Sequence, residues 1–132
     1  MTKWHAVSGG TSPGPTLAVA PVTAWTDPAA GNLVTWDTGG NQYVDECAAD
    51  ENPIGQVIAV NPAATVLTVE LFTGGMVAVL PYSGAPALGN KVEADGTTDS
   101  DGNGKVRPDN VNGVGRVIAR DRVSGYVDVY FG

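Results

Sequence analysis

The sequence predicts an all-β protein, a small β-barrel or sandwich built from two similar halves, with an extended N-terminal arm. Three observations predict this fold. Apolar and polar residues alternate along several short segments, turns rich in glycine and proline separate these segments, and two blocks of sequence recur in the same order. No window has helical periodicity over more than about two turns. With 132 residues, the chain has room for one domain with a modest core.

The first stretch, residues 1–26, is predicted to be an extended arm. It contains Gly9, Gly10 and three prolines, and a proline pushes the residue before it towards extended geometry. The arm also carries five apolar side chains, which a free linker would not be expected to keep: Trp4, Leu17, Val19, Val22 and Trp25. We therefore expect the arm to dock, either back onto its own domain or onto a partner.

Residues 27–132 are predicted to form a single β domain. Apolar residues alternate with polar ones in 67–71 and in 126–131, which places one set of side chains on a core face. The continuous apolar runs 57–60 and 76–80 are typical of more deeply buried strands. Turn signals such as Asp95-Gly96 separate the strands.

An internal repeat relates residues 28–72 to residues 86–131. The block PAAGNLVTWD at 28–37 aligns with PALGNKVEAD at 86–95, and IGQVIA at 54–59 aligns with VGRVIA at 114–119. The repeat predicts two similar strand–loop–hairpin halves, with residues 74–80 as the link between them. The alternative is that a composition rich in glycine, alanine and valine produces such echoes by chance.

Charge and composition exclude several classes of partner. Fourteen acidic and seven basic side chains give a net charge of -7, and an acidic surface repels the phosphates of nucleic acids. No apolar run approaches the ~18 residues of a membrane span, and the N-terminus lacks the layout of a signal peptide. The single cysteine, Cys47, excludes an intrachain disulfide and a multi-cysteine zinc site. We therefore expect neither a nucleic acid nor a membrane as partner.

No set of residues has the pattern of a catalytic site. The only histidine, His5, lies in the predicted arm, where no packing would hold a general base. Cys47 follows Asp45 and Glu46, two carboxylates that would raise the pKa of its thiol and leave it poorly reactive. No glycine-rich phosphate loop is present. We expect no catalytic residues, no cofactor and a protein that is not an enzyme.

One loop, residues 99–104, partly matches a calcium-binding loop. Asp99, Asp101 and Asn103 supply oxygens at alternate positions, and a glycine stands at the fourth of these six residues and again at the sixth. The twelfth position, which should be a glutamate, is Asn110. Because a polar hairpin loop also requires Asp, Asn and Gly, we expect a solvated loop and no bound metal. Asp99, Asp101 and Asn103 are only weak candidates for metal ligands.

The order of motifs within residues 31–131 carries a resemblance to a known family. A glycine-led strand at 31–34 precedes the motif at 54–59, and a strand then runs into 74–81. A second glycine-led strand at 87–92 follows, and the motif at 114–119 precedes a closing strand at 126–131. This arrangement resembles the capsid cement, or head decoration, proteins of phages. Residues 33–37 and 67–71 are also similar to the decoration protein of lambdoid phages, whereas the loop 95–110 is longer here.

The resemblance implies a structural virion protein. Such a protein is made in the host cytoplasm and binds the outer surface of the expanded capsid as a homotrimer, where it stabilises contacts between major capsid proteins. The N-terminal arm would order on the capsid and add a strand or a wedge to it, with the five apolar side chains of the arm as capsid-binding residues. The alternative is a carbohydrate- or cell-surface-binding β module on a virion, because three tryptophans and four tyrosines could stack on sugars.

Overall fold

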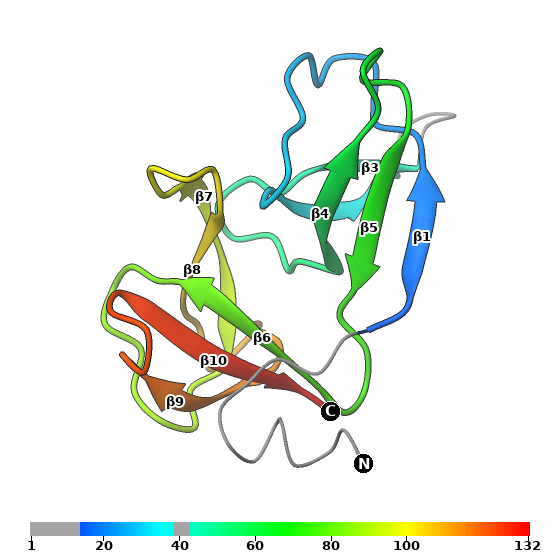
Figure 1. Cartoon of the computed structure of the whole chain (residues 1–132). Coiled ribbons are helices and arrows are strands. Elements are labelled where there is room, and N and C mark those ends of the chain that lie inside the picture. The colour runs from blue at the N-terminus through cyan, green and yellow to red at the C-terminus, as the bar shows by residue number, and fades with distance from the viewer. Residues whose placement is uncertain (1–13, 39–42) are drawn as a thin grey trace.

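The computed structural model describes residues 14–38 and 43–132, and every regular element within these ranges is a strand (Figure 1). The strands are β1 (Thr16–Val19), β2 (Leu33–Trp36), β3 (Val44–Glu46), β4 (Gly55–Val60), β5 (Leu67–Leu71), β6 (Met76–Pro81), β7 (Val92–Thr98), β8 (Gly104–Pro108), β9 (Arg116–Arg120) and β10 (Tyr126–Phe131). They form three antiparallel sheets, ordered β1-β5-β4-β2-β3, β6-β10-β9 and β7-β8. The all-β prediction is confirmed in its sandwich-like form, and the barrel form is wrong because the sheets do not close.

The strands divide into a first unit, β1 to β5 (residues 14–72), and a second unit, β6 to β10 (residues 73–132) (Figure 1). Each unit contains the same turn before its second strand. In the first unit the side chain of Asn32 accepts a hydrogen bond from the backbone of Ala29 at 2.9 Å. In the second unit Asn90 accepts one from Ala87 at 2.7 Å. The glycines before these asparagines have φ of 98° and 84°, so the repeated Gly-Asn pair encodes one turn twice.

Strand pairing is repeated as well. β1 pairs with β5 as β6 pairs with β10, and β4 and β9 each carry a bulge at an isoleucine, Ile58 and Ile118. A single parallel bridge joins Pro21 to Val44 in the first unit and Tyr82 to Val106 in the second. β6 is therefore the counterpart of β1. The buried strand predicted at 76–80 is confirmed as Met76–Pro81. This segment, which we expected to link the halves, is the first strand of the second unit.

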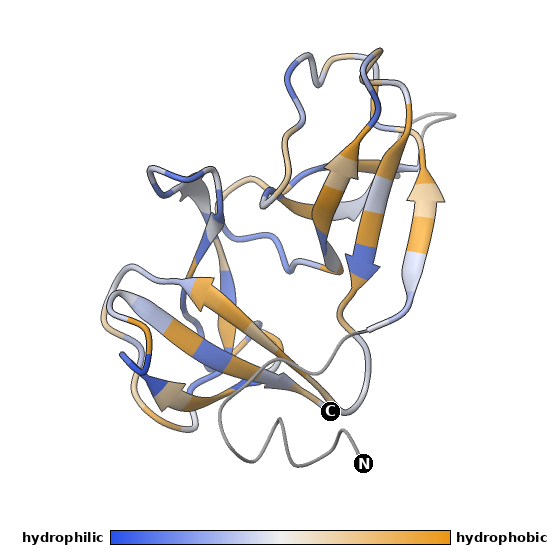
Figure 2. Cartoon of the chain, viewed as in Figure 1, coloured by the Kyte–Doolittle hydropathy of each residue, from blue (hydrophilic) through white to orange (hydrophobic). Residues whose placement is uncertain are grey.

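Two hydrophobic cores replace the single core expected from the length. The first core contains Val19, Trp25, Val34, Val44, Val57, Leu67 and Val69. The second contains Leu33, Cys47, Met76, Ala78, Leu80, Val92, Ala94, Val106, Val117, Val127, Val129 and Phe131. Figure 2 shows the corresponding hydrophobic bands on the strands of both units. Leu33 and Cys47 belong to the first unit by sequence, so the second core extends across the boundary between the units.

Backbone hydrogen bonds also join the two units. The segment after β3 runs beside β7, where the N–H of Asp50 donates to the carbonyl of Ala94 at 3.2 Å and the N–H of Ala94 donates to Glu51 at 2.9 Å. The N–H of Gly104 donates to the carbonyl of Gly31 at 2.9 Å. These contacts, together with the shared core, hold the units in one fixed arrangement.

Candidate functional site

The structure places most of the described apolar residues of the expected arm within the first unit. Val19 and Trp25 are only 6% and 8% exposed in the first core, and Val22 packs against that core. Leu17, at 37% exposed, is the one that presents apolar surface to solvent. Trp4 lies outside the described residues. Residues 14–26 are thus anchored on their own sheet by Val19, Val22 and Trp25, whose side chains are largely turned away from a partner.

Among the described residues, β1 forms an open edge of the first sheet. It pairs with β5 on one side and stands last in the strand order, and Thr16, Leu17 and Ala18 are all exposed. An edge strand presents unpaired backbone N–H and C=O groups, which another extended chain can use. Lysine or proline inside a strand would block such pairing, but β1 contains neither, since Pro15 and Pro21 lie outside its ends.

The counterpart strand β6 is buried. Met76, Val77, Ala78 and Leu80 are each 5% exposed or less. β6 also packs against β8, next to the bridge between Tyr82 and Val106. An open first strand is therefore a property of the first unit and not of the repeated fold.

The two units also differ in their net charge. Residues 14–72 contain seven Asp and Glu and no Lys, Arg or His, so their formal charge is −7. Residues 73–132 contain seven Asp and Glu with six Lys and Arg, so their formal charge is −1. Our sequence interpretation counted charge over the whole chain and missed this asymmetry, although a count for each half of the repeat would have found it.

Three carboxylates of the first unit line an open hollow of about 340 Å³ between residues 24–27 and β3. They belong to Asp27, Asp45 and Glu46, and we refer to this feature as the acidic hollow. Partial burial raises the pKa of Glu46, and the charges of Asp27 and Asp45 raise it further. Within residues 14–38 and 43–132, no Lys or Arg forms an ion pair with any of the three.

Two core residues, Trp25 and Cys47, form part of the wall of the acidic hollow. The indole N–H of Trp25 is buried and has no hydrogen-bond acceptor in the described structure. Burial is the main cause that raises the pKa of the Cys47 thiol to about 12, with smaller effects from Glu51, Glu46 and Asp45. The predicted direction of the Cys47 shift is confirmed, although desolvation outweighs the neighbouring charges on which we based it.

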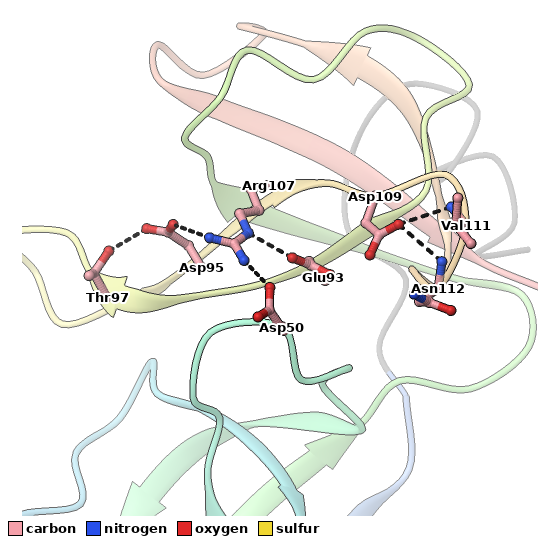
Figure 3. A network of polar contacts seen from close by, with 8 residues as sticks. All are labelled: Asp50, Glu93, Asp95, Thr97, Arg107, Asp109, Val111 and Asn112. Carbon is pink, nitrogen blue, oxygen red and sulfur yellow. Dashed lines mark hydrogen bonds and ion pairs between the residues drawn. The ribbon is translucent and has the colours of Figure 1, made fainter.

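At the junction of the units, a polar network surrounds Arg107 of β8 (Figure 3). Its guanidinium forms ion pairs with Glu93 at 2.7 Å, Asp95 at 3.7 Å and Asp50 of the first unit. Glu93 is only 5% exposed. Its pKa is raised, mainly by a hydrogen bond with Asp109 and next by burial, and the hydrogen bond from Arg107 opposes this shift. Arg107 thus neutralises a buried carboxylate and ties a loop of the first unit to the second.

The candidate calcium loop is held by its own hydrogen bonds. Asp99 accepts backbone hydrogen bonds from Asp101 and Asn103, both at 2.9 Å, and one from the Tyr126 hydroxyl. These hydrogen bonds lower the pKa of Asp99, and the bond from the Tyr126 hydroxyl has the largest effect. The side chain of Asn103 donates to the Tyr126 hydroxyl at 3.1 Å. Asp99 and Asn103 therefore fix the end of the β7–β8 hairpin, while Asp101 is exposed.

An open groove of about 470 Å³ is lined mainly by the second unit and by Phe72 at the end of the first. The ring of Phe72 stacks on that of Phe131, with the centroids 4.5 Å apart. Lys91 and Arg116 contribute to the lining of the groove. Over the ranges described, no cluster of three or more His, Cys, Asp and Glu is arranged to hold a metal ion. No helix in those ranges is long and apolar enough to span a membrane.

Comparisons with known proteins add no relative to these observations. No family model matches the chain, and no curated protein or solved structure matches it either.

Proposed function

We propose that this chain is a structural virion protein that binds the outer surface of an expanded phage capsid as a homotrimer. There it stabilises contacts between neighbouring major capsid proteins. The observation that carries the proposal is the open edge of β1, which is exposed, whereas its counterpart strand β6 is buried. Both strands belong to a β body in which residues 14–38 and 43–132 contain no helix. The motif order of residues 31–131 supplies the family to which the proposal refers.

The open edge supports binding by strand addition. An extended segment of a capsid protein would pair with the backbone of β1, and Leu17 would fill an apolar pocket on the capsid surface beside that segment. Trp4 and Leu17 are the capsid contacts of this proposal, whereas Val19, Val22 and Trp25 hold β1 in place. Three copies in one trimer bind with a high effective concentration, so modest affinity at each edge suffices.

The charge of the body supports an external location. A chain of net charge -7 is repelled by packaged DNA and remains soluble on the outside of a capsid. A protein that binds only the expanded capsid stabilises that state by mass action. When the free protein concentration is 100 times the Kd, the stabilisation is about 2.7 kcal/mol per site. Stabilisation of the expanded capsid therefore requires no catalytic step.

Co-sedimentation with expanded and unexpanded capsids of the phage that encodes the chain tests the proposal. The full chain should have a light-scattering mass near three times 13.5 kDa and should sediment with expanded capsids only. Leu17→Lys places a charge at the open edge and should weaken binding at least about tenfold. Val66→Lys adds the same charge at an exposed position of the same unit and is the matched control.

Either of two results would overturn the proposal. One is that the wild-type chain does not bind expanded capsids, and the other is that Leu17→Lys binds them as tightly as Val66→Lys. Binding to glycans without binding to capsids would replace the proposal with the carbohydrate-binding alternative.

A further inference from the structure

We infer that a groove of the second unit binds a carboxylate side chain from the first unit of another copy, and that this head-to-tail contact joins the copies. The groove is the one of about 470 Å³ that Phe72 and Phe131 help to line. We refer to it as the cationic groove, because Lys91 and Arg116 line it as well. The inference deepens the proposed function, on which it rests for the number of copies.

Backbone hydrogen bonds bring the two cations of the groove near each other. The N–H of Val117 donates to the carbonyl of Asn90 at 2.9 Å. These two residues are the chain neighbours of Arg116 and Lys91. The guanidinium of Arg116 also donates to the carbonyl of Gly89 at 3.1 Å. Two like charges in one groove repel each other, so a bound anion relieves this repulsion.

The first unit shows that the repeated turn requires neither of these charges. Gln56 stands at the position of Arg116 and donates to the carbonyl of Gly31 at 3.0 Å, so a neutral side chain makes the same hydrogen bond. Leu33 stands at the position of Lys91 and is buried. The two positive charges are therefore a property of the second unit alone, and the turn leaves them available for a ligand.

The two cations have no carboxylate partner within the copy that carries them. Each of the other three arginines of the second unit forms an ion pair: Arg107, Arg120 and Arg122. Across residues 14–38 and 43–132, neither Lys91 nor Arg116 forms an ion pair with any carboxylate, and no Asp or Glu side chain lines the groove. A neutralising anion must therefore come from outside this copy.

Aromatic rings complete the cationic groove. The stacked rings of Phe72 and Phe131 and the ring of Tyr130 contribute to its lining. Apolar walls exclude water and lower the local dielectric constant, so an ion pair formed in the groove is stronger than one on an open surface. The groove thus fits a carboxylate carried on a protein segment, whose carbon atoms can pack on the rings.

The first unit of another copy supplies carboxylates without competing cations. Residues 14–72 contain seven Asp and Glu and no Lys, Arg or His. Opposite charges steer a first unit towards the cationic groove of another copy, and the negative charge disfavours contacts between two first units. The contact joins two different surfaces, so its repetition about a three-fold axis closes three copies into a ring.

Sedimentation equilibrium of the full chain tests the contact. The wild type should associate towards three times 13.5 kDa, and rising salt should weaken the association. Lys91→Glu should weaken association at least about tenfold, because it repels the carboxylate of the other copy. Lys105→Glu makes the same charge change in the second unit outside the groove and should associate as the wild type does.

A neutral variant separates charge from folding. Arg116→Gln copies the residue of the first unit, so it should keep the hydrogen bond to Gly89 and the wild-type circular dichroism spectrum. It should still weaken association about fivefold, whereas Arg116→Lys, which keeps the charge, should weaken it less.

Zero-length crosslinking identifies the partner carboxylate. A carbodiimide joins a lysine amine to a carboxylate in contact with it, and a mixture of ¹⁴N and ¹⁵N chains marks links between copies by their mixed isotope content. We expect Lys91 to be joined to an Asp or Glu of residues 14–72 of the other copy, and Lys105 to form no link between copies. A monomeric wild type, wild-type association in Lys91→Glu, or links between copies that omit Lys91 would overturn the inference.

Capsid binding separates this inference from the proposed function. If Lys91→Glu associates as the wild type does while the wild type sediments with expanded capsids and Leu17→Lys does not, the inference fails and the proposed function stands. If Lys91→Glu loses association but the wild type ignores expanded capsids, the proposed function fails and the contact between copies remains.

Discussion

The two units of this protein share a backbone plan but present different surfaces. Turns, bulges and bridges recur at matching places, and the hydrogen bonds from Gly31 to Val57 and from Gly89 to Val117 are both 2.7 Å long. In contrast, the first strand is exposed in one unit and buried in the other, and all six cations within 14–132 lie in the second unit. Backbone geometry thus defines the repeated unit, while its edge and charges are free to serve different contacts.

The largest effect we expect comes from removing the side chain that anchors residues 14–26. Trp25→Ala should lower the free energy of unfolding by about 3–5 kcal/mol, because it empties a site in the first core. Trp36→Ala removes the same side chain where it is 47% exposed and should cost less than about 1 kcal/mol. Urea unfolding followed by circular dichroism measures both variants. Equal losses would contradict the placement of Trp25 in the core.

The next effect concerns the cation that only the second unit contains. Arg107→Met should destabilise the protein by about 3 kcal/mol, because it leaves the buried carboxylate of Glu93 without its partner. Asp45→Met, the same replacement at the matching position of the first unit, should leave stability unchanged or raise it, since it relieves repulsion with Glu46. Thermal unfolding at pH 7 compares the two, and a similar loss in both would show that Arg107 has no special role.

The repeated turn separates backbone strain from packing. Gly31→Ala and Gly89→Ala both place a side chain at positive φ, which costs about 1–2 kcal/mol. At Gly31 the new carbon would also meet Gly102 and Asn103 of the second unit, whereas nothing lies within 4 Å at Gly89. We expect Gly31→Ala to cost at least about 1 kcal/mol more than Gly89→Ala in urea unfolding. The reverse order would contradict the contact between the units at this turn.

The smallest effect is an opposite pH dependence in the two units. The pKa of Glu46 is raised, so its contribution favours the folded state at acid pH and is lost as the pH rises through the folded pKa. The pKa of Asp99 is lowered, so its contribution is present at neutral pH and is lost as the pH falls through the folded pKa. Glu46→Gln should therefore be more stable than the wild type at pH 7, and Asp99→Asn less stable.

Unfolding curves between pH 3 and pH 7 measure the two differences. The Glu46→Gln difference should shrink towards pH 3, because the wild-type carboxyl with its raised pKa becomes protonated and then resembles the amide. The Asp99→Asn difference should begin to shrink near pH 4, where the unfolded carboxyl becomes protonated, and should vanish only below the lowered pKa of the folded state. A difference that stays constant over this range would show that the replaced carboxyl acts through packing and not through its charge.

The sequence predicted the repeated framework because its signals are local. Gly-Asn turns and alternating apolar residues need no knowledge of distant contacts, and they indicated β2, β4, β5, β6, β9, β10 and the start of β7. β3 was not predicted, and the expectation of a long loop at 95–110 was wrong because this segment contains the end of β7 and all of β8. β1 was missed because three nearby prolines favoured an arm, although each lies outside the strand. Its relation to β6 was missed because the repeat was traced only from residue 28 onwards, although Thr-Leu-Ala-Val and Met-Val-Ala-Val share their Ala-Val pair.

The candidate sites depend on contacts that no local pattern contains. The acidic hollow joins Asp27 to Asp45, 18 residues further along the chain. The bridge between Pro21 and Val44 and the packing of Trp25 in the first core bring these segments together. The open edge exists because the first unit leaves β1 exposed where the second buries β6, a difference of tertiary packing. The difference in charge between the units is partly predictable from sequence. It follows from counting charged residues, but only after the boundary between the units is known.

Burial of the only cysteine has a practical consequence for attaching chemical groups to this protein. With a thiol pKa of about 12, Cys47 is present as thiolate in only about one molecule in 10⁵ at pH 7. Maleimides and disulfide reagents should therefore leave the native chain unmodified while it is folded. A single cysteine introduced at an exposed position such as Val66 would become the one reactive thiol. Fluorophores or peptides could then be attached at a chosen point without removing the native cysteine first.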